Sequence, residues 1–378
     1  MIYLDNSATT KPYPSVLKSF QEVSERFFSN PSSIHQFGGE AEKLLLKARE
    51  QAAQLLNVLK EEIVFTSGGT EGNNMAIKGI ALQHQSRGKH IITTQIEHPS
   101  IIEACESLET LGFDVTYLPV DENGVVSVTD VEQAIRPDTI LISIMHVNNE
   151  LGSIQPIKAI ADIAKRYPKL FFHVDNVQGV GKVHLDLQHE GINLCSISAH
   201  KIHGLKGTGI LYVQKGTTLF SLLHGGGQEN SIRSGTENLA GIVSMVKALR
   251  LVKEKELMID EMYQLQQYLR SQLEEMAKVV VNTPREAAPH IMNFSVPGLK
   301  PEVIIHMLGK HEIYISTRSA CSSKNLDESH VLAACGHDKK RTTAALRVSF
   351  GYETTKEELD TFVQVLKNAI MELKEVME

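Results

Sequence analysis

The sequence has few cysteines, no excess of basic charge and no long apolar run, and each shortage excludes a class of protein. Its 378 residues include 4 cysteines, too few for a disulfide framework in a chain of this size. Lysine and arginine number 38 against 45 acidic residues, so with a net charge of −7 the chain is a poor candidate for direct nucleic-acid binding. No apolar stretch is long enough to span a bilayer, and no secretory signal is visible. We therefore expect a cytoplasmic protein with free thiols and no membrane contact.

What is present is typical of a globular chain, with 42% apolar and 22% charged residues. Short apolar runs alternate with amphipathic helical segments such as Glu40 to Leu56. The runs are Ile63 to Phe65, His90 to Ile92, Phe113 to Leu118, Ile140 to Met145, Leu170 to Val174, Ile192 to Ile197 and Ile210 to Val213. This alternation predicts an α/β fold whose large domain holds a mostly parallel seven-stranded sheet flanked by helices.

The alternation of short apolar runs with amphipathic helical segments ends at about Lys255. A charged helical stretch from Glu254 to Ala277 leads into a second region, and an amphipathic helix begins near Lys356. Strands are predicted there at Ile291 to Val296, Ile313 to Ser316 and Leu346 to Phe350. We expect a large domain over residues 16–254 and a smaller α+β domain formed by residues 1–15 and 255–378.

Polar residues follow several of the predicted strands, at the edge where parallel strands place their ligands. Thr66 to Asn74 is rich in glycine and enters a helix, which favours a phosphate cup, although a capped strand–turn–helix junction is an even alternative. Asp175 ends one buried strand, and Lys201 follows the next between two histidines. Taken singly, an Asp is more often a turn cap and a Lys more often a surface residue. His98 and Asn149 follow two further strands.

Together these residues describe a site for pyridoxal 5'-phosphate, which needs a phosphate cup, a carboxylate for its ring nitrogen, a flat side chain to stack on the ring and an amine for its aldehyde. The chain also resembles cysteine desulfurases of the NifS/IscS type, which are class V aminotransferase-like enzymes of fold type I. The resemblance covers nearly the whole chain. It is carried by the motifs Tyr3 to Thr10, Thr66 to Asn74, Asn148 to Gly152, His173 to Gln178, Ser198 to Lys201 and Arg233 to Thr236.

The resemblance implies a role for each matching residue. Lys201 would be the Schiff-base lysine, Asp175 would pair with the pyridine nitrogen, and His98 would stack on the ring and assist proton transfer. Gln178 and Asn149 would contact the phenolic oxygen of the ring. The residues implied to hold the phosphate are Gly69, Thr70, Ser198, His200 and, from the other subunit of a homodimer, Thr236. Arg347 would bind the substrate carboxylate, and Asn149 would also be a substrate-binding residue. We expect the side chains of Asn176 and Val177 to point away from the ring, and we predict no metal site.

Cys321 stands apart from the other cysteines because its neighbours are small or polar, whereas Cys195 and Cys335 lie among apolar residues. An incidental exposed cysteine is the alternative. The resemblance assigns Cys321 as the persulfide-forming cysteine, on a loop over about residues 318–328, and we predict that role.

The reaction implied is conversion of L-cysteine to L-alanine, leaving a persulfide on Cys321 that passes to a sulfur acceptor. That acceptor would be a tRNA-thiolating enzyme, an iron–sulfur scaffold or the acceptor of another thio-cofactor pathway. Two alternatives stay open: an aminotransferase or a lyase acting on selenocysteine or cystine, and a non-catalytic binding protein on the same fold. The second is disfavoured because Lys201 and Asp175 are both present.

Overall fold

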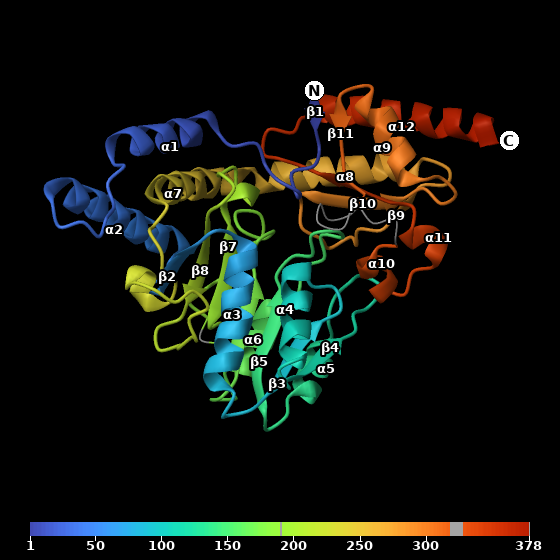
Figure 1. Cartoon of the computed structure of the whole chain (residues 1–378). Coiled ribbons are helices and arrows are strands. Elements are labelled where there is room, and N and C mark those ends of the chain that lie inside the picture. Colours follow the sequence, from blue (N-terminus) through green and yellow to red (C-terminus); the bar gives the residue numbers. More distant parts are fainter. Residues whose placement is uncertain (190, 318–327, 378) are drawn as a thin grey trace.

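The computed structural model describes residues 1–189, 191–317 and 328–377, and a seven-stranded sheet lies at its centre (Figure 1). In spatial order its strands are β2 (Ile63–Thr66), β8 (Gly209–Val213), β7 (Leu194–Ser198), β6 (Phe171–Asp175), β5 (Thr139–Met145), β3 (His90–Thr94) and β4 (Asp114–Leu118). Within this sheet β8 runs antiparallel to both neighbours, and every other pair is parallel. The predicted α/β fold is confirmed.

Helices cover both faces of this sheet. One apolar cluster joins strand residues such as Val64 and Leu211 to helices α3 (Gly69–His84) and α4 (Pro99–Glu109). The strand neighbours of Val64, Ile63 and Phe65, point to the other face. The helices packed on that second face include α2 (Gln36–Leu56), α6 (Ile157–Ala164) and α7 (Leu239–Glu254). Alternate residues of one strand therefore enter opposite cores, as the pleat requires.

The second region contains a three-stranded sheet in the order β12-β10-β9. Its elements are η4 (Lys255–Met258), α8 (Ile259–Glu274), β9 (Val280–Val281), β10 (Ile291–Ser295), α9 (Pro301–Gly309), β11 (Ile313–Tyr314), α10 (His330–Ala334), α11 (Lys339–Thr342), β12 (Ala345–Ser349) and α12 (Lys356–Met377). The helical stretch predicted over residues 254–277 is thus divided between the end of α7, η4 and α8. The domain boundaries stay a prediction. No helix in the described ranges is both long and apolar enough to cross a membrane.

The N-terminal segment links this second region to the edge of the central sheet. Strand β1 (Ile2–Tyr3) pairs in parallel with β11, and helix α1 (Pro14–Arg26) follows it in the chain. Between them the backbone N–H of Thr10 donates to the carbonyl of His200 at 2.8 Å. Residues 5–10 therefore lie along the carboxyl ends of the central strands, where the candidate site residues follow those strands.

Candidate active site

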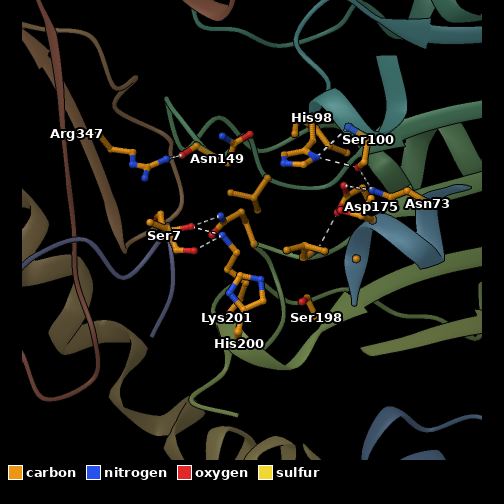
Figure 2. Close-up of a pocket in the computed structure, with 17 residues that line it drawn as sticks. Ser7, Asn73, His98, Ser100, Asn149, Asp175, Ser198, His200, Lys201 and Arg347 are labelled. Carbon is orange, nitrogen blue, oxygen red and sulfur yellow. Dashed lines mark hydrogen bonds between the residues drawn. The ribbon is translucent and has the colours of Figure 1, made fainter. Parts of the chain in front are cut away.

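One cavity lies at the carboxyl ends of the central strands, and residues from both regions line it (Figure 2). The lining residues are Ser7, Ala8, Gly69, Thr70, Asn73, His98, Ser100, Met145, Val147, Asn149, Asp175, Val177, Gln178, Ser198, His200, Lys201 and Arg347. The parallel strands β3, β5, β6 and β7 deliver several of them because their carboxyl ends meet at one edge of the sheet.

The start of helix α3 forms one wall of the cavity and is shaped to accept an anion. Gly68 adopts φ +153°, a conformation that residues with a side chain rarely adopt. A Cβ on Gly69 would lie 2.7 Å from Cγ2 of Val177, so only glycine leaves the wall open here. Opposite, the buried Ser198 Oγ has no hydrogen-bond partner among the described residues. Free backbone N–H groups, a helix N-terminus and an unpaired hydroxyl suit a phosphate.

Asp175, at the end of β6, lies at the head of a hydrogen-bonded chain that reaches His98. The side chain of Asp175 is 5% exposed and accepts from Nδ2 of Asn73 at 2.8 Å. The same Asn73 nitrogen donates to Ser100 Oγ at 2.9 Å, which lies 2.8 Å from His98 Nδ1. Because the Ser100 backbone N–H also donates to Nδ1, that nitrogen is an acceptor and Nε2 carries the proton. Burial lowers the pKa of His98, with opposing contributions from Asp175, which raises it, and Lys201, which lowers it.

Lys201, in the turn η2 (Ala199–Lys201) that follows β7, reaches across the cavity to the N-terminal segment. Its Nζ donates to the carbonyl of Ser7 and, at 3.0 Å, to that of Ala8. Behind it, the Nζ of Lys182 donates to the Lys201 carbonyl at 3.1 Å. Lys182 is 4% exposed, and burial lowers its pKa to about 8. One lysine therefore faces the cavity while a second supports its backbone from within the fold.

Arg347, in β12, and Asn149 close the opposite side of the cavity. Arg347 is 1% exposed, and its Nη1 donates to the Asn149 carbonyl at 2.7 Å. Gln178 donates to the Ser7 carbonyl at 3.0 Å, so the N-terminal segment binds side chains from two walls. A guanidinium next to an open cavity is suited to bind a carboxylate.

The structure brings most of the predicted site residues together. Those that line the cavity are Gly69, Thr70, His98, Asn149, Asp175, Gln178, Ser198, His200, Lys201 and Arg347. Thr236 does not; it lines a separate depression that also includes Ser67. Cys321 lies outside the described residues. The roles of all these residues stay predictions.

The other three cysteines are buried and free, and burial raises the pKa of each thiol. For Cys105 and Cys335 the pKa rises to about 12. Thiols that stay protonated at neutral pH are weak nucleophiles. None of these three is suited to covalent chemistry.

The expectation for Val177 was wrong. Asn176 does point away, and its Oδ1 lies 2.8 Å from His146 Nδ1. Val177 instead lines the cavity beside Gly69. The alternation of side chains along β6 ends at Asp175, where the chain enters a turn, so the two-residue period of the strand no longer predicts direction.

Sequence reasoning assigned no role to Asn73, Ser100, Ser7, Ala8 or Lys182. Asn73 and Ser100 lie near the starts of α3 and α4, where polar residues ordinarily cap helices. Ser7 and Ala8 act through backbone carbonyls, which leave no side-chain signal. The available clue was Lys182, a lysine within a run of small and apolar residues.

This arrangement fits pyridoxal 5'-phosphate. The anion cradle with its unpaired Ser198 hydroxyl would hold the phosphate, and Lys201 would meet the aldehyde. The Asp175 carboxylate, almost fully buried, needs a cationic partner, and a protonated ring nitrogen supplies one. The fold and the site together define a pyridoxal 5'-phosphate-dependent enzyme.

Comparisons with known proteins agree with this class. The family model described as aminotransferase class-V matches residues 2–362. A protein from Dictyoglomus turgidum named cysteine desulfurase IscS is 44% identical over 99% of this chain and 96% of its own length. A Lactobacillus delbrueckii subsp. bulgaricus protein named as a NifS/IcsS homolog is 47% identical over 96% of this chain and 95% of its own. The chain belongs to the aminotransferase class-V family.

Solved structures lead to the same family. A structure titled NifS-like protein superposes with a TM-score of 0.92 at 37% identity and covers 98% of this chain and 99% of its own. One titled SspA in complex with cysteine gives 0.81 at 33% identity, over 94% of this chain and 100% of its own. The resemblance predicted from the motifs is confirmed.

Proposed function

We propose that the protein is an L-cysteine desulfurase. The observation that carries the proposal is that one cavity contains an amine for the cofactor, Lys201, a carboxylate for its ring, Asp175, and a guanidinium for an amino-acid carboxylate, Arg347. The names of the relatives and the cysteine in a similar structure support the choice of substrate. The net reaction breaks the C–S bond of L-cysteine and forms an S–S bond on the Cys321 thiol, giving L-alanine and a persulfide.

The chain's own residues divide the work as follows. The cofactor, when bound, supplies the electron sink that makes the substrate Cα acidic. Arg347 binds the substrate carboxylate and so fixes the Cα. Lys201 Nζ is the base that takes the Cα proton. The Nε2–H of His98, oriented through Ser100, is placed to donate a proton in the same cavity.

The test measures L-alanine and protein persulfide after the holoenzyme meets L-cysteine. We expect one alanine for each sulfur transferred, with the persulfide mapped by mass spectrometry to the Cys321 peptide. Cys321→Ala should keep the cofactor absorbance and lose sulfur transfer, whereas the matched control Cys335→Ala, at a buried thiol, should keep both. Full activity of Cys321→Ala would rule out the assigned nucleophile, and pyruvate with ammonia would indicate a lyase.

The acceptor we propose is a protein thiol, of a tRNA-thiolating enzyme or of an iron–sulfur scaffold. Several relatives carry the name IscS, which supports the proposal without choosing between the two. We place the reaction in the cytoplasm, because a reducing compartment keeps such thiols available. The test is to capture an acceptor that has a single cysteine as a mixed disulfide. We expect the wild-type protein to capture it through Cys321 and the Cys321→Ser protein not to capture it. Equal capture by the two proteins would contradict the proposal.

We also propose that the enzyme is a homodimer in which Thr236 serves the partner's phosphate. Apolar side chains in the connection after α1 and at the start of α2 stand exposed on the single chain: Phe28 at 76%, Ile34 at 107% and Phe37 at 56%. Such a group usually marks an interface. Ile34→Glu should produce a monomer with weakened cofactor binding, while Leu257→Glu, at a leucine that is 91% exposed, should stay dimeric. Light scattering measures both, and a wild-type monomer would disprove the proposal.

A further inference from the structure

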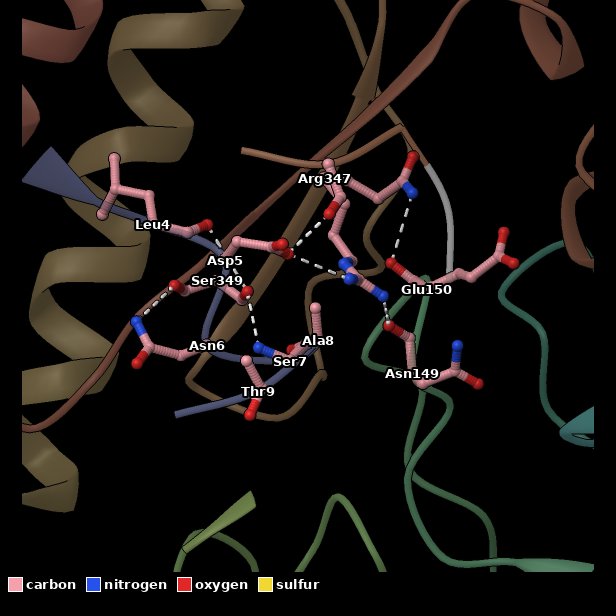
Figure 3. Close-up of polar contacts among 12 residues, drawn as sticks. Leu4, Asp5, Asn6, Ser7, Ala8, Thr9, Asn149, Glu150, Arg347 and Ser349 are labelled. Atoms are coloured by element: carbon pink, nitrogen blue, oxygen red, sulfur yellow. Dashed lines mark hydrogen bonds and ion pairs between the residues drawn. The ribbon is translucent and has the colours of Figure 1, made fainter. Parts of the chain in front are cut away.

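Arg347 is held by two groups that approach it from different parts of the chain (Figure 3). Its Nη1 donates to the Asn149 carbonyl, and its Nη2 lies 3.2 Å from Oδ1 of Asp5. At 1% exposure a guanidinium needs a countercharge. Among the described residues, Asp5 is the acidic side chain within ion-pair distance of Arg347.

Asp5 is itself fixed in place. Its Oδ1 also accepts a hydrogen bond from Ser316 Oγ at 2.6 Å, and its backbone is bridged to Ser349. Ser316 in turn pairs with Arg347 through backbone hydrogen bonds of 3.1 and 2.7 Å. The carboxylate and the guanidinium are therefore attached to one rigid arrangement of backbone.

Asp5 contacts the guanidinium from outside the cavity. Arg347 lines the cavity, whereas Asp5 does not. An arginine side chain carries five N–H donors. The hydrogen bonds to Asn149 and Asp5 use two of them, and the buried Nε–H has no partner among the described residues. The contact with Asp5 thus restrains the guanidinium while leaving donors for a ligand.

We propose that Asp5 is a positioning residue, which aims the Arg347 guanidinium at the carboxylate of the amino-acid substrate. The inference rests on the proposed function, since it takes the Arg347 ligand to be the α-carboxylate. The alternative is that Asp5 only neutralises the charge of Arg347, and this alternative predicts a different result. Removing it would leave Arg347 a stronger cation and would tighten the binding of any carboxylate.

The test compares two amines that differ by one carboxylate, L-alanine and ethylamine, titrated into the full-length holoenzyme while the cofactor absorbance is followed. Because a hydrogen bond to a charged group contributes enough to change affinity about tenfold or more, Asp5→Ala should raise the Kd of L-alanine by that factor. The Kd of ethylamine should stay within about twofold. With L-cysteine, KM should rise and kcat should change little, as expected for lost carboxylate binding.

Conservative and matched variants separate positioning from other effects. Asp5→Asn keeps an oxygen that accepts from both Ser316 and Arg347, so it should restore L-alanine binding to within about threefold of wild type. Glu312→Ala removes an exposed acid that pairs with the N-terminus of the same segment and should change neither Kd. If Asp5→Ala does not fold, Asp5→Ser, whose hydroxyl is too short to reach the guanidinium, takes its place with the same expectation.

Three results overturn the inference. They are an unchanged Kd for L-alanine in Asp5→Ala, equal weakening of both amines, or tighter L-alanine binding in Asp5→Ala and Asp5→Asn alike. Arg347→Ala distinguishes the levels of failure. If Arg347→Ala raises the Kd of L-alanine more than that of ethylamine and Asp5→Ala does not, the role of Asp5 alone is wrong. If neither substitution raises the Kd of L-alanine more than that of ethylamine, the proposed carboxylate site is wrong and the inference falls with it.

Discussion

The contact between Gly69 and Val177 allows a sharp test of the phosphate cradle. A methyl group added by Gly69→Ala would lie 2.7 Å from Val177 Cγ2 and 3.7 Å from Ser198 Cβ. The best separation of two carbon atoms is about 3.5–4.0 Å, so the first contact is shorter by about 1 Å and the second is acceptable. Val177 is β-branched and turns poorly at χ1, so the strain cannot be relieved by a simple rotation.

Overpacking of this kind costs about 1–3 kcal/mol. Either the start of α3 or Val177 must move, and both line the cavity. We therefore expect Gly69→Ala to lower the thermal stability of the apoprotein and to weaken binding of pyridoxal 5'-phosphate by about five- to 150-fold, the range that corresponds to that strain. Thermal unfolding and equilibrium dialysis measure the two effects.

The double variant Gly69→Ala/Val177→Ala decides whether the reasoning is correct. Val177→Ala removes the clashing methyl group, so the double variant should recover most of the cofactor affinity, while Val177→Ala alone should bind about as well as wild type. Wild-type affinity in Gly69→Ala, or a double variant no better than Gly69→Ala, would refute the account of the cradle.

Three further predictions concern buried polar groups. Asn73→Ala removes a donor to the Asp175 carboxylate and should weaken cofactor binding about tenfold in dialysis, whereas Asn74→Ala, whose amide donates only to a backbone carbonyl among the described residues, should not. Glu229→Gln breaks a pair with Arg49 whose side chains are 3% and 12% exposed, and should lower the free energy of unfolding by about 3 kcal/mol in denaturant titration. Burial raises the pKa of Glu97 from 4.5 to about 8, so its protonated form stabilises the fold below pH 4.5 and that contribution is lost as pH rises through 8. Glu97→Gln mimics the neutral form of the side chain at every pH. The melting temperature of the variant minus that of wild type should therefore be larger at pH 8 than at pH 5. An equal difference at the two pH values would contradict the raised pKa of Glu97.

Local signals were enough to predict the sheet and most of the cavity. Buried parallel strands read as near-continuous apolar runs, and their carboxyl ends meet at one edge. Asp175 and Lys201 could therefore be predicted to lie in one site although they stand 26 positions apart in the sequence. Helix α12, with Leu359 and Phe362 in its buried face, followed from its period alone.

The contacts that sequence reasoning missed depend on long-range packing. Asp5 and Arg347 stand 342 positions apart, and no local pattern links them. Ser7 and Ala8 contribute carbonyls, whose direction depends on how β1 pairs with β11. Val177 was misplaced because it lies in the turn after β6, where no regular period fixes the direction of a side chain.

The central claim is that Lys201 binds the cofactor in this cavity, and borohydride reduction of the holoenzyme tests it most directly. Reduction makes the bond between lysine and cofactor permanent, and peptide mass spectrometry then locates it. The cofactor should be found on the peptide that contains Lys201, and Lys201→Ala protein should carry none. Attachment to the neighbouring buried Lys182, or to no lysine at all, would contradict the account.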